Sequence, residues 1–443
     1  MLKLYDNGIY LVHGETICSC PEEAAQKSGI TTTKEEAAKG TMAYGILKAH
    51  NQSNDMDQLR LKFDSMTSHD ITYVGIIQTA RASGMKQFPL PYVLTNCHNS
   101  LCAVGGTINE DDHLFGLTAA RKYGGIFVPP HLAVIHQYAR EMMAGCGKMI
   151  LGSDSHTRYG ALGTMAVGEG GPEIVKQLLK NTYDIASPQV VLVYLKGTPR
   201  RGIGPHDIAI ALVKATFASG FVNNCVLEFA GPGIASLPID FRNGIDVMTT
   251  ETTCLSSIWP ADHTLKAHLA VLGRGEAFKP QAPADGAYYD GLIEVELDKI
   301  RPMIALPFHP SNAYTIQEFQ ENLDELLHQV DEDTVRQLKL KNRPASLREK
   351  IVDGKFRVDQ GVIAGCSGGL FDNITEAADI LRGGSCGNGY FSLDGYPTSV
   401  RVSLELTRIG ATTDLLECGA VIKPSFCGPC FGAGDVPANN GLS

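Results

Sequence analysis

Short apolar runs alternate with segments of helical periodicity between residues 70 and 190, and this alternation restricts the possible folds more than any other feature. Runs of strand type occur at Tyr73–Gln78, Tyr92–Asn96, Ile126–Val128 and Met149–Leu151. Helical periodicity follows at His131–Ala144 and Pro172–Leu179. Because this rhythm buries apolar strands between layers of helices, it predicts an α/β fold with doubly wound sheets and helices on both faces.

The chain has 443 residues, too many for one hydrophobic core, so two or three domains are expected. A new strand–helix series begins near Pro188, and a third begins near His309 with the helix-capping pair Thr315 and Glu318. The predicted domains are 1–187, 188–308 and 309–443. The first is expected to open with a β-hairpin, because Asn7-Gly8 lies between two alternating apolar–polar runs.

The charge and the cysteines narrow the class of protein. A net charge of −10 argues against a sequence-independent nucleic-acid binder, because neutralising phosphates requires basic patches. No apolar run approaches the length of a membrane span, so neither nucleic acid nor membrane is an expected partner. The twelve cysteines are scattered rather than regularly spaced, which disfavours a secreted disulfide framework and favours a reducing cytosol or organelle matrix. Of these, a cytoplasmic location is predicted.

Three cysteines are candidates for a metal site. Cys366 follows the strand-like run Gly361–Gly365, and Cys427 and Cys430 flank Gly428-Pro429. Three thiolates can hold a metal or a cluster and leave one position open for Lewis-acid chemistry. A thioredoxin-type redox pair is disfavoured, because only thirteen residues follow Cys430. A zinc site remains open, with Cys386 or Cys418 as the fourth ligand.

A second candidate site is Asp154-Ser155-His156, in the segment Gly152–Thr157 that directly follows the run Met149–Leu151. Adjacent side chains on an extended segment point to opposite faces, so these three cannot form a Ser-His-Asp triad among themselves. They can enter a shared cleft as binding or orienting groups. The glycines that follow fit no dinucleotide fingerprint.

Isolated residues give weaker signals. His98 lies at the end of a predicted strand and is a candidate site residue. A histidine within a helix, such as His136, is more often structural. Glu251 is a lone carboxylate among Thr, Ser and Cys residues, a setting compatible with a partly buried acid.

Taken together, these segments resemble the aconitase/isopropylmalate isomerase family of iron–sulfur hydro-lyases. The family's motifs are matched, in order, by Ile135-His136-Gln137, Asp154-Ser155-His156-Thr157, Glu251 with Pro260, Cys366, and Cys427-Gly428-Pro429-Cys430. Each motif is weak alone, but their common order is specific.

The resemblance implies three α/β domains of an aconitase-like core around a [4Fe-4S] cluster held by Cys366, Cys427 and Cys430. It implies an iron–sulfur-dependent hydratase or dehydratase whose substrate is a small hydroxy-di- or tricarboxylic acid. It assigns catalytic roles to His98, His136, Asp154, His156 and Glu251. It assigns substrate contacts to Ser155 and Gln78. A non-catalytic Fe–S or zinc-binding sensor or interaction protein is the alternative.

The chain also departs from the family pattern. Cys97 stands where the family usually has an Asp beside the histidine matched by His98, and Tyr159 stands where an Asn is expected. The family's arginine-containing segment and its C-terminal swivel domain have no counterpart in this sequence. The resemblance therefore implies a third domain incomplete at its C-terminus and a chain that is inactive alone. The expected partner is a swivel domain or an equivalent subunit.

Overall fold

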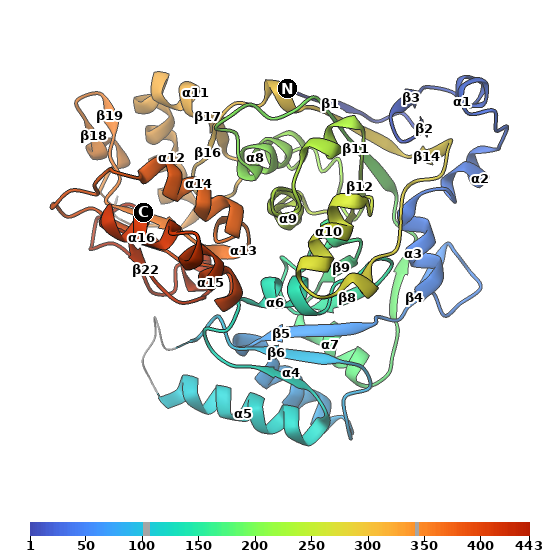
Figure 1. The fold of residues 1–443 in the computed structure, drawn as a ribbon, viewed down its shortest axis with the longest axis horizontal. Coiled ribbons are helices and arrows are strands. Elements are labelled where there is room, and N and C mark those ends of the chain that lie inside the picture. Colours follow the sequence, from blue (N-terminus) through green and yellow to red (C-terminus); the bar gives the residue numbers. More distant parts are fainter. Residues whose placement is uncertain (101–106, 342–344) are drawn as a thin grey trace.

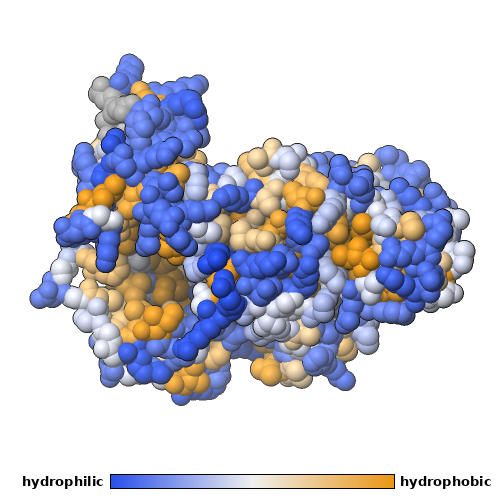
Figure 2. All heavy atoms as spheres, turned by 90° about the horizontal axis from the view of Figure 1, so that it is seen from above, coloured by the Kyte–Doolittle hydropathy of each residue, from blue (hydrophilic) through white to orange (hydrophobic). Residues whose placement is uncertain are grey.

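The computed structural model describes residues 1–100, 107–341 and 345–443. Three sheets built mainly of parallel strands, each accompanied by helices, form the molecule and confirm the predicted α/β class (Figure 1). Seen from above, the surface is mostly hydrophilic, and hydrophobic side chains gather in a recess on the side of the C-terminal part (Figure 2). In the described ranges, no helix combines the length and the apolar character that a membrane crossing requires.

The first sheet has the order β7-β6-β5-β8-β9, and all its strands are parallel. Its strands are β5 (Ser65–His69), β6 (Tyr92–Thr95), β7 (Ile126–Val128), β8 (Met149–Gly152) and β9 (Met165–Gly168). Its helices are α4 (Asp70–Ala82), α5 (Thr107–Tyr123), α6 (Ile135–Met142) and α7 (Gly171–Leu178). Leu151 packs with α4 and α7, whereas its neighbour Ile150 packs with α6, so helices cover both faces. The strand order reverses between β5 and β8, which is where open α/β sheets bind ligands.

The second sheet has the order β1-β15-β11-β12-β13 and is parallel except for β1. Its strands are β1 (Leu2–Tyr5), β11 (Val190–Lys196), β12 (Val226–Ala230), β13 (Ser256–Ile258) and β15 (Gly291–Glu296). The helices of this region are α8 (Pro205–Thr216), α9 (Ile239–Met248), α10 (His263–Val271) and the 3₁₀ turn η3 (Thr249–Thr252). Trp259, fully buried, stacks on Phe229 at 3.9 Å between ring centroids and anchors this core.

The predicted hairpin around Asn7-Gly8 is wrong. Strand β1 pairs with β15, and β2 (Ile9–Val12) pairs with β3 (Thr16–Cys18) and with β14 (Ala287–Tyr289). Long-range pairing therefore overrides the local turn signal. The glycine at position 8 is needed for a different reason, because a Cβ atom there would collide with the Tyr288 ring.

The third sheet is parallel, with the order β20-β21-β22. Its strands are β20 (Gln360–Ile363), β21 (Ser392–Gly395) and β22 (Val421–Ile422). The helices of this region are α11 (Ile316–Glu321), α12 (Leu323–Gln337), α13 (Gly365–Gly368), α14 (Phe371–Leu381), α15 (Val400–Arg408), α16 (Ala411–Glu417) and the 3₁₀ turn η7 (Gly428–Phe431). The predicted capping pair is confirmed, since the Thr315 and Glu318 side chains each accept a hydrogen bond from the other's backbone N–H.

Short elements connect these regions. They are α1 (Pro21–Ser28), α2 (Lys34–Ala38), α3 (Met42–His50), β4 (Gln58–Leu61), β10 (Tyr183–Ala186), β16 (Met303–Ala305), β17 (Ala313–Thr315), β18 (Ile351–Val352), β19 (Lys355–Phe356), and the 3₁₀ turns η1 (Gly160–Leu162), η2 (Pro232–Ser236), η4 (Gly275–Ala277), η5 (Leu297–Lys299) and η6 (Leu347–Lys350).

One predicted strand is wrong: Tyr73–Gln78 lies inside α4. Its apolar residues follow helical spacing, with Tyr73, Ile76 and Ile77 buried on one face.

Candidate active site

A cavity of about 500 Å³ is lined by residues that follow the carboxyl ends of β5, β6 and β8 in the first sheet and of β20 and β22 in the third. Among the predicted site residues, those that line the cavity are His98, His136, Asp154, Ser155, His156, Glu251, Cys366, Cys427 and Cys430. Residues from all three predicted domains therefore meet in one place. The cavity lies at the carboxyl ends of parallel strands, where binding crevices form in open α/β sheets.

Gln78 is the predicted residue that the structure does not bring to this cavity. It is exposed on α4 and lines a separate cavity between α4 and α5. Its assignment as a substrate contact came from the family resemblance alone. Gln78 lies in the third turn of α4, and the residue at the sheet's carboxyl end is His69, the last residue of β5.

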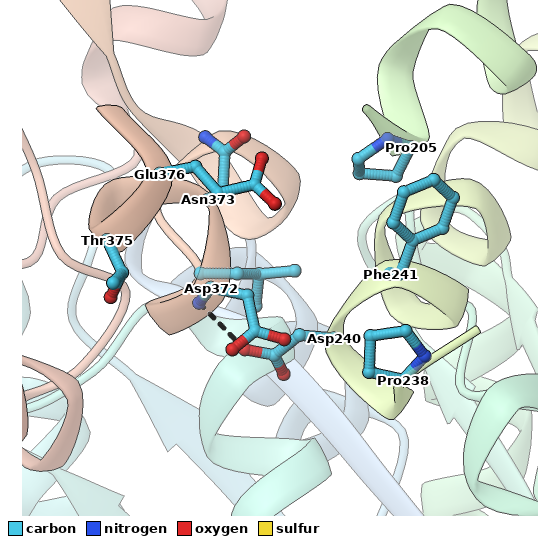
Figure 3. A pocket seen from close by; sticks show the side chains of 9 residues that line it. Pro205, Pro238, Asp240, Phe241, Asp372, Asn373, Thr375 and Glu376 are labelled. Atoms are coloured by element: carbon cyan, nitrogen blue, oxygen red, sulfur yellow. Dashed lines mark hydrogen bonds between the residues drawn. The ribbon is translucent and has the colours of Figure 1, made fainter. Parts of the chain in front are cut away.

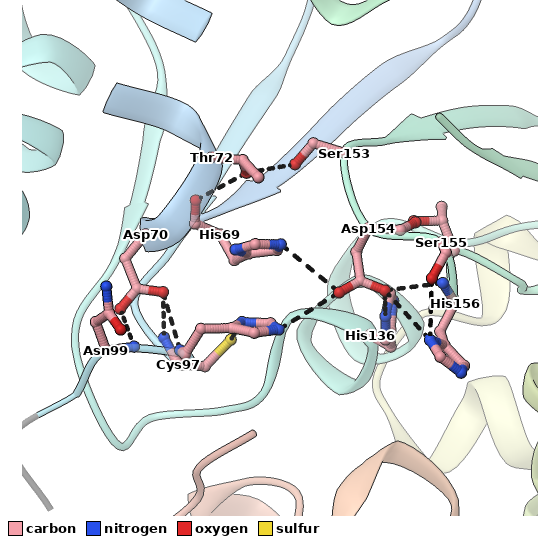
Figure 4. A network of polar contacts seen from close by, with 12 residues as sticks. His69, Asp70, Thr72, Cys97, Asn99, His136, Ser153, Asp154, Ser155 and His156 are labelled. Atoms are coloured by element: carbon pink, nitrogen blue, oxygen red, sulfur yellow. Dashed lines mark hydrogen bonds and ion pairs between the residues drawn. The ribbon is translucent and has the colours of Figure 1, made fainter. Parts of the chain in front are cut away.

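The Asp154 carboxylate is the centre of the polar network (Figure 4). Its Oδ1 accepts hydrogen bonds from His136 Nε2 at 2.9 Å and from the His156 backbone N–H at 2.8 Å. Its Oδ2 faces His98 Nε2 at 3.4 Å and His69 Nε2 at 3.6 Å. Burial alone would raise the pKa of Asp154, but the surrounding histidines hold it well below its usual range. Asp154 is therefore a fixed anion that orients several imidazoles.

His136 is held at both ring nitrogens. Because the Asp154 carboxylate accepts at Nε2, that nitrogen carries the proton, and Nδ1 accepts from the Tyr159 hydroxyl at 3.1 Å. Burial lowers the pKa of His136, which favours this neutral tautomer. Tyr159 is fully buried and stands where the resemblance expected an Asn. The tyrosine is a partner of His136 that the sequence could not identify.

His156 and Glu251 form a pair inside the cavity. His156 Nε2 donates to Glu251 Oε1 at 2.9 Å, and Nδ1 lies 3.3 Å from the Ser155 hydroxyl. Burial would lower the pKa of His156, but the bonds to Asp154 and Glu251 raise it to about 9. The same contact lowers the pKa of Glu251. At neutral pH the pair is an imidazolium and a carboxylate, and about a third of the His156 side chain is exposed.

Three further histidines at the site were not identified from the sequence. His69 stacks on His98, with ring centroids 3.7 Å apart, and His206 lines the cavity. His309 Nε2 lies 3.6 Å from Glu251 Oε2, and its ring stacks on Phe217. Of the three, only His69 had a signal in the sequence, because it lies at the end of a β-strand and His98 lies close to the end of another.

The three predicted metal ligands line one side of the cavity. Cys427 is buried, Cys366 is half-buried and Cys430 is exposed. Burial raises the pKa of Cys366 and of Cys430, and a contact with Cys97 raises that of Cys427. Such thiols stay protonated until a metal cation displaces their protons. Thus the donor set is suited to a metal that supplies compensating positive charge.

The two cysteines left open as fourth zinc ligands pair with each other instead. Cys386 Sγ and Cys418 Sγ are 4.0 Å apart, and both pack in the core formed by α14, α15 and α16. Neither lines the cavity.

Another cavity, of about 180 Å³, lies between α9 and α14 and is acidic (Figure 3). The Asp372 backbone N–H donates to Asp240 Oδ2 at 3.4 Å, so the two carboxylates are close. Burial and the Asp240 charge raise the pKa of Asp372 to about 6. Of the site residues predicted from the sequence, none lines this cavity.

Comparison with known families decides the identity of the fold. The model of the aconitase family (aconitate hydratase) matches residues 44–443. The chain belongs to the aconitase family. The match covers the cavity and every residue that lines it, so the resemblance drawn from the short motifs is confirmed.

Individual members of the aconitase family also match the chain in sequence. The chain is 27% identical over 395 residues to the mitochondrial aconitate hydratase of Schizosaccharomyces pombe, covering 84% of this chain and 46% of the relative. It is 26% identical over 418 residues to the mitochondrial enzyme of Candida albicans, covering 89% of this chain and 50% of the relative. For the mitochondrial enzyme of Gracilaria gracilis the identity is 26%, over 86% of this chain and 48% of the relative. The chain thus spans about half the length of the curated relatives it matches.

The mitochondrial location of these aconitate hydratases overturns the cytoplasmic location predicted from the cysteines. Scattered free thiols indicate a reducing compartment, and a mitochondrial matrix satisfies that condition as well as the cytosol does.

Proposed function

We propose that this chain forms the cluster-binding core of an iron–sulfur hydro-lyase that acts on a small hydroxy-di- or hydroxy-tricarboxylic acid. The observation that carries the proposal is a single cavity that combines three cysteines with the His156–Glu251 pair and Asp154. Proteins of the aconitase family generally bind a [4Fe-4S] cluster, and the relatives named above are aconitate hydratases.

The surroundings of Cys366, Cys427 and Cys430 fit such a cluster. Gly365 has φ +83°, and a Cβ atom there would lie 2.7 Å from Cys430 Sγ, so the glycine leaves room for sulfur. Arg140 is buried, donates to the Cys366 carbonyl at 2.5 Å, and forms no ion pair with any carboxylate in the described ranges. Its Nε is buried and unpaired. A buried guanidinium of this kind is compensated when an anionic thiolate–cluster group lies beside it.

When bound, the cluster supplies a Lewis acid at the iron that has no cysteine ligand. We assign the proton that leaves with the substrate hydroxyl to the His156–Glu251 pair. The proton is held at His156 Nε2, and Glu251 Oε1 lies 2.9 Å from it, inside the cavity. His136 has both nitrogens engaged by protein groups, so its proposed role is to hold Asp154 and Tyr159 in place. Ser155 is proposed to contact a substrate carboxylate. His98, whose two ring nitrogens face Cys97 and Asp154, is proposed to support Asp154.

The cavity suggests where the remaining substrate contacts come from. No lysine or arginine from the described parts of the chain lines it, although a di- or tricarboxylate requires cationic partners. We propose that a further domain or subunit supplies these cations and the base that removes the carbon-bound proton. We also propose that the domains 1–187, 188–308 and 309–443 meet at this cavity, since they contribute Asp154, Glu251 and Cys366, respectively.

Anaerobic reconstitution of the 443-residue chain with iron and sulfide tests the cluster assignment. We expect four irons and four sulfides per chain, the visible absorption of a [4Fe-4S] cluster, and an EPR signal after one-electron reduction. Adding 2- and 3-hydroxy di- and tricarboxylates one at a time should shift that signal for the compound that binds.

Matched cysteine variants make the test specific. Cys366→Ser, Cys427→Ser and Cys430→Ser should each prevent assembly of the four-iron cluster, whereas Cys386→Ser, outside the cavity, should not. A full cluster in all three ligand variants would refute the assignment. A cluster whose EPR signal no hydroxycarboxylate shifts would argue against the proposed substrate class.

A further inference from the structure

Cys97 is a buried cysteine beside the proposed cluster ligands, and the proposed function gives it no role. Its Sγ, a ring nitrogen of His98 and Cys427 Sγ all lie within 4.8 Å of one another, and all three residues are buried. The two chain segments are held together directly, because the Cys427 backbone N–H donates to the Cys97 carbonyl at 2.8 Å. The three donor atoms are therefore brought together by backbone pairing as well as by side-chain packing.

We propose that Cys97, His98 and Cys427 form a mononuclear site for a thiophilic divalent cation such as Zn²⁺. In a tetrahedral zinc site with bonds of about 2.3 Å to sulfur and 2.0–2.1 Å to nitrogen, neighbouring ligand atoms are roughly 3.4–3.8 Å apart. Cys97 Sγ lies 3.3 Å from His98 Nδ1, and the remaining separations are below 4.8 Å. Side-chain movements of about 1 Å or less would complete the coordination.

The His98 ring is already oriented for such a site. Its Nε2 lies 3.4 Å from Asp154 Oδ2, so the carboxylate favours the proton at Nε2 and leaves the Nδ1 lone pair toward Cys97. A carboxylate, an imidazole and a cation in line form the arrangement that orients zinc-binding histidines in general. The ring is also stacked between His69, at 3.7 Å, and Phe431, at 5.3 Å between centroids.

The backbone that carries two of the ligands is fixed by another carboxylate. Asp70 Oδ1 accepts from the backbone N–H of Cys97 at 3.3 Å and of His98 at 2.9 Å (Figure 4). Its Oδ2 lies 3.1 Å from His113 Nε2. Asp70 is buried, so its charge adds to that of Asp154 and makes the surroundings favourable to a cation.

The charges balance, and an entry path exists. Two thiolates neutralise a divalent cation, and His98 coordinates it as a neutral imidazole. His98 and Cys427 line the 500 Å³ cavity, whereas Cys97 lies behind them, so the open fourth position of the cation faces the cavity. A water molecule or a ligand in the cavity can occupy that position.

Cys427 belongs both to the site proposed here and, under the proposed function on which this step rests, to the cluster. One thiolate cannot serve the mononuclear cation and the [4Fe-4S] cluster in these two different arrangements at once. Zinc at the Cys97 site and the cluster therefore exclude each other, and zinc bound to the cluster-free protein should block cluster assembly.

Cobalt(II) titration of the cluster-free 443-residue chain, under anaerobic conditions, tests the site. Tetrahedral cobalt bound by thiolates gives sulfur-to-cobalt charge-transfer and visible d–d bands, which we expect to saturate at one equivalent. Loss of an outer-sphere partner already costs about 10–100-fold in metal affinity, so Cys97→Ser should weaken binding by at least about 100-fold. Cys366→Ser and Cys430→Ser should retain the bands, because neither residue belongs to the site.

A reversed pattern would overturn the proposal: bands that survive Cys97→Ser and disappear in Cys430→Ser place the cation at the three-cysteine set. Wild-type chain without thiolate–cobalt bands would overturn it as well. X-ray absorption of the zinc-loaded wild-type chain identifies the ligand atoms even if a variant fails to fold. Two sulfurs and a nitrogen around zinc would support the site, and three sulfurs would contradict it. Iron–sulfur reconstitution separates the two assignments, because Cys97→Ser should still assemble the cluster and Cys430→Ser should not.

Discussion

Asp154 Oδ1 accepts a hydrogen bond from His136 Nε2 at 2.9 Å, and this contact joins the end of β8 to the first turn of α6. The other oxygen of the same carboxylate faces His98 and His69, at the ends of β6 and β5. One anion therefore sets the tautomer and the direction of imidazoles from several chain segments. The geometry of the site therefore depends on the negative charge of Asp154 as well as on the hydrogen bonds that it accepts.

Asp154→Asn tests that dependence. The amide can still accept from His136, but its NH₂ group turns a donor toward His98 and His69, and the anion is lost. Under the proposed function we expect the rate of hydration to fall on the order of 10²–10³-fold with the fold retained. The measurement is kcat of the chain combined with the further domain or subunit proposed above, on the hydroxycarboxylate that binds. Asp379→Asn, an exposed carboxylate on α14, is the matched control, and equal rates in both variants would contradict the role of Asp154.

The pairing of His156 with Glu251 makes a prediction about pH. The pKa of His156 is raised to about 9, above its value of 6.5 in an unfolded chain. The stability that protonated His156 contributes is therefore complete below about pH 6.5 and is lost as the pH rises through about 9. In Glu251→Gln the negative partner is gone, so we expect the pKa of His156 to fall by about 1–2 units. NMR titration of the imidazole measures the shift, with the exposed Glu325→Gln as control; an unchanged pKa would disprove the coupling.

Gly365→Ala tests whether the turn before Cys366 is shaped for the cluster. An alanine is strained at φ +83°, and its Cβ would lie 2.7 Å from Cys430 Sγ, displacing that sulfur. We expect less iron and sulfide per chain after reconstitution. Gly368→Ala, three residues later, meets no atom within 4 Å and should assemble the cluster normally. Equal cluster content in the two variants would show that the glycine serves only the backbone.

Much of this site was predictable because its residues follow strand ends. Strands β6 and β8 were recognised from their apolar runs, and His98 and Asp154 lie shortly after their ends at Thr95 and Gly152. Cys366, Cys427 and Cys430 were recognised from spacing, which constrains which thiols can share a ligand. Parallel strands then bring these segments to one crevice, a consequence of topology rather than of local sequence.

The residues that sequence reasoning missed owe their position to tertiary packing. Tyr159 reaches His136 from the loop before η1, and His309 reaches Glu251 from a distant segment. No periodicity or spacing encodes such contacts. The misassigned strand Tyr73–Gln78 has a different origin, because a short apolar run does not distinguish a strand from one face of a helix. Its helical form is what leaves Gln78 on the outer surface.

Tyr289→Phe examines a contact between the N-terminal region and the second sheet. Glu228 is fully buried in β12, and its carboxylate accepts from the backbone N–H groups of Met42 and Ala43 and from the Tyr289 hydroxyl at 2.7 Å. Burial raises the pKa of Glu228, so each donor matters.

Removing that hydroxyl leaves a buried carboxylate short of one donor and should cost about 1–2 kcal/mol. Urea unfolding measures the loss, and hydrogen exchange at the first amides of α3 should accelerate. Tyr5→Phe, at a partly exposed position of β1, is the control. Unchanged protection in α3 would refute the anchoring role of the tyrosine.

The acidic cavity between α9 and α14 gives the final prediction, which concerns stability rather than activity. Burial and Asp240 raise the pKa of Asp372 to about 6, above the 3.8 of an unfolded aspartate. The folded state therefore holds the proton more tightly, so the chain loses stability as the pH rises from about 4 through about 6. Asp372→Asn removes the buried charge and should stabilise the chain at pH 8 by about 1–3 kcal/mol, with little effect at pH 4. Melting temperatures of the variant and the wild type at both pH values measure this difference. The control is the exposed Asp379→Asn on the same helix, which should show no such difference. A gain in stability that is equal at pH 4 and pH 8 would contradict a charge effect.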